Sequence, residues 1–173
     1  MFGAVYRNME IIHALDTHHP KIKEIAENTW PITFAGILSV HQIDYMLEMM
    51  YSLDSLKKQS DQGHHQFLLG KVNHEFMSYA SYEINYADQS VTKIHKIYIL
   101  PAFQGRGSGK DLIDFIRMKA LAAGNNALRL NVHKNNKAQL FYNKMGFQEI
   151  KREVIDIGHG YLMDDVQMEQ SLI

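Results

Sequence analysis

Cysteine is absent from the 173-residue chain, which excludes disulfide bonds, thiolate catalysis and zinc–thiolate sites together. The formal net charge is only −1, so the chain has no overall attraction to nucleic acid or to an anionic membrane. It also contains no run of about 18 apolar residues, the length that a membrane-spanning helix needs. We therefore expect a cytoplasmic protein without nucleic-acid or membrane partners.

Proline is scarce as well, with three residues in the chain, so glycine, asparagine and aspartate must mark most of the turns. Apolar residues make up 46% of the sequence and charged residues 21%, as in ordinary globular proteins. A chain of this length can build one well-packed core but is short for two. We expect one domain over residues 1–173, with residues 1–8 as a lead-in before the first strand.

Two kinds of apolar periodicity alternate along the chain and predict a mixed α/β protein with helices packed on the faces of a sheet. Strands are predicted at residues 9–15, 66–72, 75–85, 91–100, 127–132, 147–157 and 160–170. Helices are predicted from residue 16 onward, after Ser39, and at 52–62, 110–123 and 135–145. The short turns between the strands of residues 66–100 favour an antiparallel meander.

The most informative segment is FQGRGSGKDL, Phe103 to Leu112, in which Gly105, Gly107 and Gly109 alternate with other residues. It lies between a predicted strand and a predicted helix. Such a turn directs unpaired backbone N–H groups and the positive end of the helix dipole at one point, which is a binding site for phosphate. A glycine-rich loop without any ligand is the alternative interpretation.

Two common phosphate-binding motifs do not fit this turn. A Walker A loop requires a glycine where Gln104 stands and a serine or threonine where Asp111 stands. The dinucleotide motif Gly-x-Gly-x-x-Gly also fails, because its last position falls on Lys110 or Leu112. The pattern that remains is Gln-x-x-Gly-x-Gly, from Gln104 to Gly109.

This pattern resembles the Gln/Arg-x-x-Gly-x-Gly/Ala pyrophosphate-binding motif of the GNAT superfamily of N-acetyltransferases. The preceding strand, IYILPAFQGRG, is similar to the fourth strand of that family, and NNKAQLFYNKMGF at residues 135–147 resembles its later signature Asn-x-x-Ala…Phe-Tyr-x-Lys-x-Gly-Phe. The order of elements matches over residues 9–170. The resemblance implies the GNAT fold, a mixed and mostly antiparallel sheet of about seven strands with helices on both faces.

The resemblance also implies acetyl-CoA as co-substrate and a set of residues that would bind it. Backbone groups of Ile97, Tyr98 and Ile99 would pair with the pantetheine arm where the fourth and fifth strands diverge. The pyrophosphate would be held by the turn, and two later residues would contact the coenzyme. The predicted set for these contacts is Gln104, Gly105, Arg106, Gly107, Ser108, Gly109, Lys110, Asn135 and Lys144. For Asn135, a helix N-cap is the other interpretation.

For catalysis, the resemblance places Tyr142 as the general acid that protonates the departing thiolate. Many family members carry a glutamate as general base at the position of His95. Histidine titrates near neutral pH and can take that role, and Glu83 is a second candidate. Strict alternation along the strand puts His95 on the same face as Ile97 and Ile99.

The acceptor is predicted to be a small primary amine that attacks directly in a ternary complex, since a cysteine acyl-enzyme is excluded. A weaker likeness of segments near Asp44 and Met49 to bacterial polyamine acetyltransferases makes a polyamine the first expectation. Four acidic residues could attract it: Glu24, Glu27, Asp44 and Glu48. A protein N-terminus or lysine as acceptor, a homodimer and longer acyl donors are left open.

Two other functions compete with this interpretation, and a metal site is not expected. One is a non-catalytic acyl-CoA-binding regulatory module, which the histidine at position 95 would permit. The other is a nucleotide phosphate-binding protein, which would rest on the glycine turn alone. The neighbouring pairs His18–His19 and His64–His65 are assigned to solvated loops, because adjacent histidines rarely chelate together.

Overall fold

A computed structural model describes residues 9–62 and 64–173 of the chain. The expected lead-in at residues 1–8 lies outside the described residues. The helices are α1 (His19–Thr33), α2 (Val40–Tyr51), α3 (Leu53–Asp61), α4 (Ser108–Ala122) and α5 (Ala138–Lys144). The strands are β1 (Glu10–His13), β2 (Gln66–Val72), β3 (Glu75–Glu83), β4 (Val91–Ile99), β5 (Ala127–His133), β6 (Gln148–Gly158) and β7 (Tyr161–Ser171).

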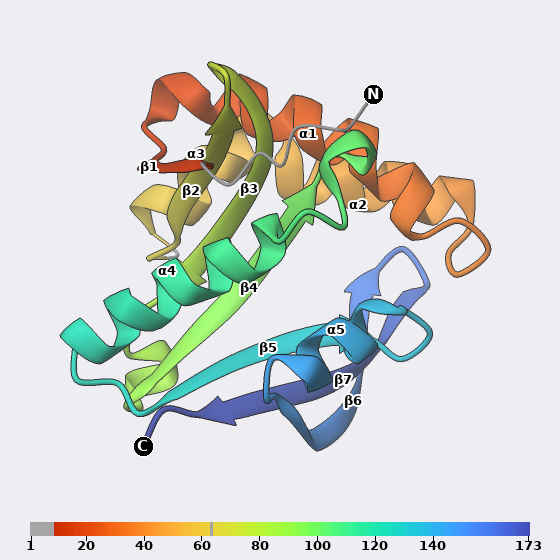
Figure 1. Ribbon diagram of the computed structural model, residues 1–173. Coiled ribbons are helices and arrows are strands. Elements are labelled where there is room, and N and C mark those ends of the chain that lie inside the picture. Colours follow the sequence, from red (N-terminus) through yellow and green to blue (C-terminus); the bar gives the residue numbers. More distant parts are fainter. Residues whose placement is uncertain (1–8, 63) are drawn as a thin grey trace, which may run out of the picture.

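The strands form one seven-stranded sheet in the order β1-β2-β3-β4-β5-β7-β6 (Figure 1). All neighbouring strands are antiparallel except β4 and β5, which run parallel. The predicted meander is confirmed as β2, β3 and β4. The mixed, mostly antiparallel sheet that the sequence predicted is therefore the observed one.

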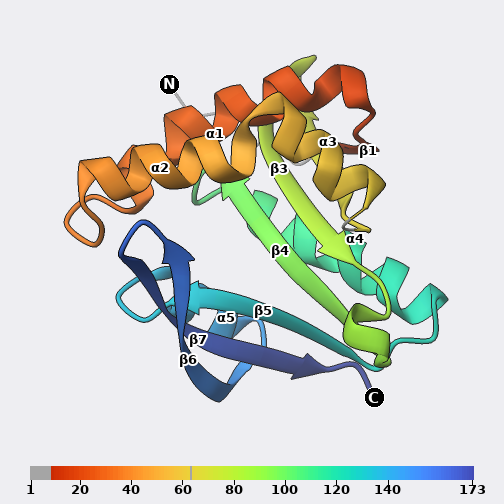
Figure 2. The ribbon, with the colours of Figure 1, turned by 180° about the vertical axis from the view of Figure 1, so that it is seen from behind.

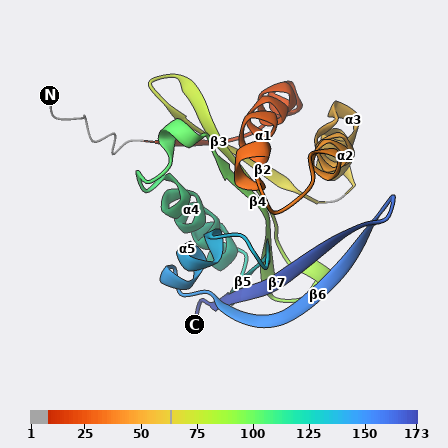
Figure 3. The same ribbon diagram turned by 90° about the vertical axis from the view of Figure 1, so that its right-hand side faces the viewer.

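Helices cover both faces of this sheet, as the view along it shows (Figure 3). One face carries α4 and α5 over a core that includes Leu112, Ile116 and Leu130. The other carries the first three helices over a core that includes Trp30 and Met46. Among the described residues, no helix has both the length and the hydropathy to cross a membrane.

The feature that matters most for function is the divergence of β4 and β5. Their parallel pairing stops at Ile94 and Leu130, although β4 continues to Ile99. Beyond this point β5 keeps its antiparallel partner β7, to which it pairs through His133 and Asp165. The two strands consequently diverge, and α1 and α2 lie beyond the end at which they are farthest apart (Figures 1 and 2).

The helix predicted from Asn135 is the clearest difference from the sequence-based elements. It begins three residues later, at Ala138, so Asn135 is not its N-cap. The side-chain Oδ1 of Asn136 accepts a hydrogen bond from the Ala138 N–H at 2.9 Å and thereby satisfies a free donor of the first turn. A short Asn-rich connection therefore separates β5 from α5.

Candidate active site

A cleft of about 1200 Å³ follows the opening between β4 and β5 and reaches the first two helices. One end is lined by the glycine turn before α4 and by the connection between β5 and α5. The other end is lined by the α1–α2 connection, α2, β6 and β7. The predicted coenzyme turn, Tyr142 and His95 all line this one cleft.

The glycine turn has the backbone geometry that its sequence requires. Gly105 and Gly107 have φ values of +73° and +90°, which residues with a Cβ rarely adopt. Gly107 is the N-cap of α4 and has no side chain that could accept hydrogen bonds from the first N–H groups of the helix. The first N–H groups of an α-helix lack acceptors within the helix, so this turn presents backbone donors at the edge of the cleft.

Gly109 is needed for a different reason, which is space. A Cβ at this position would lie 3.1 Å from Cζ of Phe141 and 3.4 Å from Cδ1 of Ile99. The start of α4 is therefore packed closely against both β4 and α5. This packing fixes the helix N-terminus relative to the strand that would hold the pantetheine arm.

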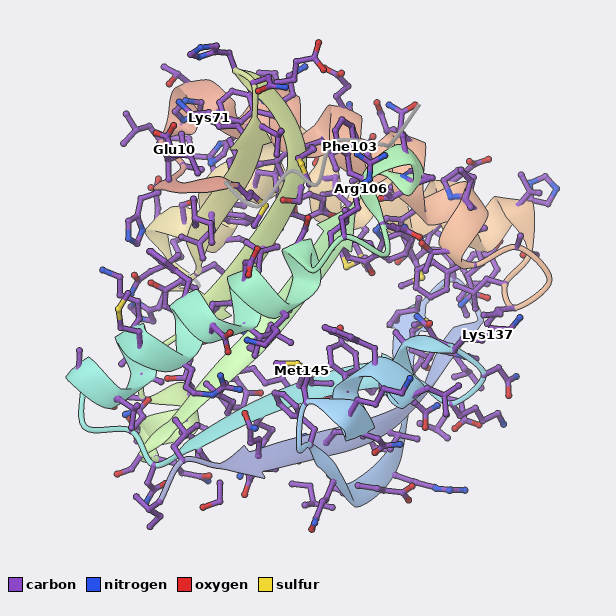
Figure 4. All side chains as sticks on the ribbon, in the orientation of Figure 1. Glu10, Lys71, Phe103, Arg106, Lys137 and Met145 are labelled. Atoms are coloured by element: carbon purple, nitrogen blue, oxygen red, sulfur yellow. The ribbon has the colours of Figure 1, made fainter. Side chains whose placement is uncertain are left out.

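The side chains of the turn play unequal parts. The Nε2 of Gln104 donates to the Ile99 carbonyl oxygen at 2.9 Å, which ties the turn to the end of β4. The ammonium group of Lys110 pairs with Asp114 one helical turn later. Arg106 lies over the ring of Phe103, with 5.6 Å from Cζ to the ring centroid (Figure 4).

Across the opening, the β5–α5 connection contributes Asn135 and Lys137 to the cleft lining. The Asn135 N–H donates to Nδ1 of His133 at 3.2 Å. Lys137 was missed by sequence reasoning, which offered no signal for it beyond the charge. Arg106 and Lys144 are not among the lining residues, so their predicted coenzyme contacts stay predictions.

Tyr142 lies on α5 with its ring against Phe141 and Phe147, at centroid distances of 5.4 and 5.8 Å. Burial raises the pKa of its hydroxyl to about 12. The group therefore holds its proton at neutral pH and can donate it inside the cleft. The same side chain packs against the core and lines the cleft.

His95 occupies a β-bulge, and this corrects the expectation about its face. The register passes from Ser81–Lys96 to Tyr82–Ile94, which leaves His95 as the extra residue. Ile94 and Ile97 both pack into the core beneath α4 although they are three residues apart. Strict alternation is thus broken, and His95 does not share the face of Ile97 and Ile99.

The ring of His95 is held by two neighbours. Its Nε2 lies 3.0 Å from Oε2 of Glu83, and its ring stacks on His65 with a centroid distance of 3.9 Å and an angle of 11°. With Glu83 ionised, Nε2 must carry the proton and Nδ1 is left as the acceptor. Glu83, the second candidate for the general base, is therefore the hydrogen-bond partner of His95, the first candidate.

Both rings of this stack are neutral at neutral pH. Burial and the positive charge of Lys96 lower the pKa of His65 to about 4. Burial, His65 and the nearby lysines lower the pKa of His95 well below its ordinary value. The pair His64–His65 was assigned to a solvated loop, and this was wrong for His65. The same assignment of His18–His19 was wrong for His19, which is buried.

These residues also form the only group of three metal-ligand side chains found among the described residues. Ligand atoms of His65, Glu83 and His95 all lie within 4.8 Å of one another. The parallel stacking of the two imidazoles directs their lone pairs side by side, whereas a tetrahedral metal needs them to converge. The expectation of no metal stays a prediction.

Lys96 is a buried cation that sequence reasoning missed. It is 8% exposed and lines the cleft on the face of the first three helices. Its Nζ donates to Oε1 of Gln59 and lies over the rings of Tyr51 and Phe67, 5.7 and 5.6 Å from their centroids. Burial lowers its pKa to about 7. A lysine inside an apolar strand was the available signal.

Asp165 is the third residue of the cleft lining that sequence reasoning missed. It lies on β7, is 8% exposed, and its Oδ1 has no hydrogen-bond partner. Burial raises the pKa of this carboxyl group, which His133, a hydrogen bond with Asn131 and Lys93 partly counteract. A buried acceptor without a partner is costly, and Asp165 faces the cleft. An acidic residue between apolar positions of a strand was the signal in the sequence.

Comparison with known proteins identifies the family. Residues 37–169 match the model of the acetyltransferase (GNAT) domain. The chain belongs to the GNAT acetyltransferase family. An uncharacterised N-acetyltransferase from the pepI 3′ region of Lactobacillus delbrueckii subsp. lactis is 26% identical over 156 residues, which are 87% of this chain and 90% of the relative.

Solved structures agree with this GNAT assignment at the level of the fold. The PaiA N-acetyltransferase of Thermoplasma acidophilum, in complex with coenzyme A, has a TM-score of 0.78 and 22% identity, over 95% of this chain and 99% of the other. A GCN5-related N-acetyltransferase of Rhodopseudomonas palustris has a TM-score of 0.82 and 19% identity, over 99% and 100%. The chain is thus a GNAT acyl-CoA-dependent acyltransferase whose fold binds coenzyme A in a relative.

Proposed function

We propose that this enzyme transfers the acetyl group of acetyl-CoA to the primary amine of a small acceptor by direct attack in a ternary complex. One observation supports this most strongly. A single cleft joins the glycine turn, the open edge of β4 and the Tyr142 hydroxyl, and it continues beyond them to the first two helices. The donor and an acceptor can therefore occupy it together.

The donor would lie along elements that offer backbone groups. The pyrophosphate would accept hydrogen bonds from the N–H groups at the start of α4, where the helix dipole favours an anion. Pantetheine would extend along residues 97–99 of β4, where β5 no longer pairs with it. This path would lead toward Tyr142, which lines the same cleft.

The proposed reaction transfers one acetyl group from sulfur to nitrogen, while the nitrogen loses one proton and the sulfur gains one. The amine nitrogen attacks the thioester carbonyl carbon, and the carbon–sulfur bond breaks. The sulfur leaves as a thiolate and takes the phenolic proton of Tyr142. The tyrosine then regains a proton from water, which its high pKa favours.

The proton lost by the amine would go to Nδ1 of His95. Glu83 holds the opposite ring nitrogen at 3.0 Å and stabilises the imidazolium that forms. The lowered pKa of His95 keeps its lone pair free at neutral pH. The amine nitrogen becomes strongly acidic once it has bonded to the carbonyl carbon, so a weak base is sufficient to take its proton.

The polyamine acceptor expected from sequence finds no support in the cleft lining. Of the four acidic residues that could attract it, Glu24 and Glu27 pair with lysines of α1. Asp44 and Glu48 lie exposed on α2. None of the four lines the cleft. A cytoplasmic location and a homodimer also stay predictions.

The proposal is tested in two stages with the purified full-length chain. Calorimetry with acetyl-CoA and with ATP should show binding of the first and none of the second. Release of free thiol from acetyl-CoA should then depend on an added primary amine. Binding of acetyl-CoA without transfer to any amine would favour the regulatory module instead, and binding of ATP would favour a nucleotide site.

A further inference from the structure

The acceptor end of the cleft is closed by contacts between α2 and the β6–β7 hairpin. The hydroxyl of Tyr45 donates to the Ile157 carbonyl oxygen at 2.7 Å, and Nε2 of Gln42 donates to the Leu162 carbonyl oxygen at 3.0 Å. Figure 2 shows the hairpin lying against this helix. The acceptor site is therefore a pocket with walls from two regions that are distant in sequence.

The walls of this pocket are apolar even where solvent reaches them. The lining includes Ile32, Phe34, Met46, Met49, Ile155 and Met163. Ile32 is 61% exposed, and Met49 and Ile155 are each 38% exposed. Large apolar side chains at the mouth of a cleft favour a ligand that covers them, and methionine adapts to the shape of an apolar ligand.

The charges around the cleft are the second observation. Among the residues that the structure describes, Asp165 is the only aspartate or glutamate in the lining. Asp165 lines the cleft and one oxygen of its carboxylate has no hydrogen-bond partner, so this carboxylate can hold one ammonium group. Lys96, a buried lysine whose contacts are Gln59 and two rings, opposes any further positive charge in its protonated form. A second ammonium group would lose its water without gaining a carboxylate.

We propose that the acceptor is a monoamine, a primary amine on an apolar body without a second cationic group. This rests on the proposed N-acetyl transfer and narrows its substrate class. The amine contacts Asp165 near the thioester, and its hydrocarbon body covers the methionine and isoleucine side chains of the pocket. Diamines and polyamines are excluded by the missing second carboxylate.

The test is a pair of acceptors that differ only in the charge of one end. Hexylamine and 1,5-diaminopentane have nearly the same length, but a methyl group of the first is an ammonium group in the second. The thiol-release rate should give a kcat/KM for hexylamine that exceeds the value for 1,5-diaminopentane by at least about tenfold. Equal values, or a preference for the diamine, would overturn the proposal.

A charge variant makes the test independent of the overall activity. Met49→Glu adds a carboxylate at the pocket mouth, at a position exposed enough to tolerate it. It should move the ratio of the two kcat/KM values toward the diamine by about tenfold. Met118→Glu is the matched control, since Met118 is 56% exposed on α4 and does not line the cleft. Its ratio should equal that of the unaltered chain.

The outcomes separate this proposal from the function on which it rests. A chain that binds acetyl-CoA but acetylates no monoamine overturns the acceptor class and leaves the donor site standing. A chain that does not bind acetyl-CoA overturns the proposed function itself. An unchanged ratio in Met49→Glu shows that the acceptor does not lie in this pocket.

Discussion

The two ends of the cleft are built from different parts of the chain. The donor end consists mainly of backbone: a glycine turn, a helix N-terminus and the open edge of β4. The acceptor end consists of side chains from α1, α2, β6 and β7, nearly all apolar. Backbone groups recognise a ligand that stays the same, whereas side chains can be exchanged without changing the fold. We therefore expect the proposed donor end to carry the family signature and the proposed acceptor end to carry the individual specificity.

The largest expected effect lies where the two ends meet. Tyr142→Phe removes the proposed acid but keeps the ring packing. We expect kcat to fall by about 10²- to 10⁴-fold, with the acetyl-CoA dissociation constant nearly unchanged. Steady-state thiol release and calorimetry measure the two quantities. Activity close to that of the unaltered chain would remove Tyr142 from the acid role.

A change at the acceptor end should leave the donor end unaffected. Asp165→Asn keeps the shape and removes the charge that would hold the ammonium group. We expect the KM for hexylamine to rise about thirtyfold, the equivalent of about 2 kcal/mol for one charge-assisted hydrogen bond. Asp164→Asn is the control, because Asp164 pairs with Lys134 and does not line the cleft. Equal effects of both variants would argue against a specific role.

A change at the proposed donor end should instead weaken the binding of acetyl-CoA. Gly107→Ala puts a Cβ at a φ of +90°, and Gly124→Ala does the same at +76° beyond the other end of α4. Each should lower the free energy of unfolding by about 1 kcal/mol. Only Gly107→Ala should weaken acetyl-CoA binding, by about tenfold. Calorimetry showing equal affinities for both variants would contradict a pyrophosphate site at this turn.

The smallest effect concerns the histidine stack at the inner side of the cleft. The folded state lowers the pKa of His65 to about 4, so the unfolded chain binds more protons below pH 6.5. The contribution of His65 to the free energy of unfolding is complete above pH 6.5 and decreases as the pH falls. Between pH 6.5 and 5.5 the loss should be about 1 kcal/mol. Urea unfolding at both values measures it.

The control for this stability test is His65→Asn, in which the contribution of His65 is gone. This variant should lose about 1 kcal/mol less than the unaltered chain over the same pH interval. His41→Asn is a useful second control, because His41 is exposed on α2. An equal loss in all three chains would show that the stack is not the cause.

The proposed donor end could be predicted from the sequence, because it depends on local patterns. Gly105 and Gly107 are required by backbone angles within the turn, and Tyr142 belongs to a short motif on α5. The elements of the sheet also followed from periodicity. The start of α5 was misplaced because Asn135 is a good N-cap residue, whereas the N-cap of the helix is Lys137 and the Ala138 N–H donates to Asn136.

The inner and acceptor sides were not predictable in the same way. The face of His95 depends on a bulge, and a bulge arises from pairing with β3 rather than from the strand itself. The stack of His65 on His95 joins residues of β4 and of the segment before β2. Asp165 and Lys96 stood out as charges within strands, but only their neighbours in space give them a role.

The sequence by itself thus determined the family, the fold and the turn that would hold the coenzyme, since glycine angles and helix termini are properties of short segments. Tertiary structure alone decided which side chains face one another across the diverging strands. Burial then sets the pKa of Tyr142, Lys96 and the histidines. Within residues 9–62 and 64–173, it also leaves Asp165 as the single carboxylate of the cleft lining. The number of charges that an acceptor can carry is for this reason a property of the folded cleft and not of any segment that lines it.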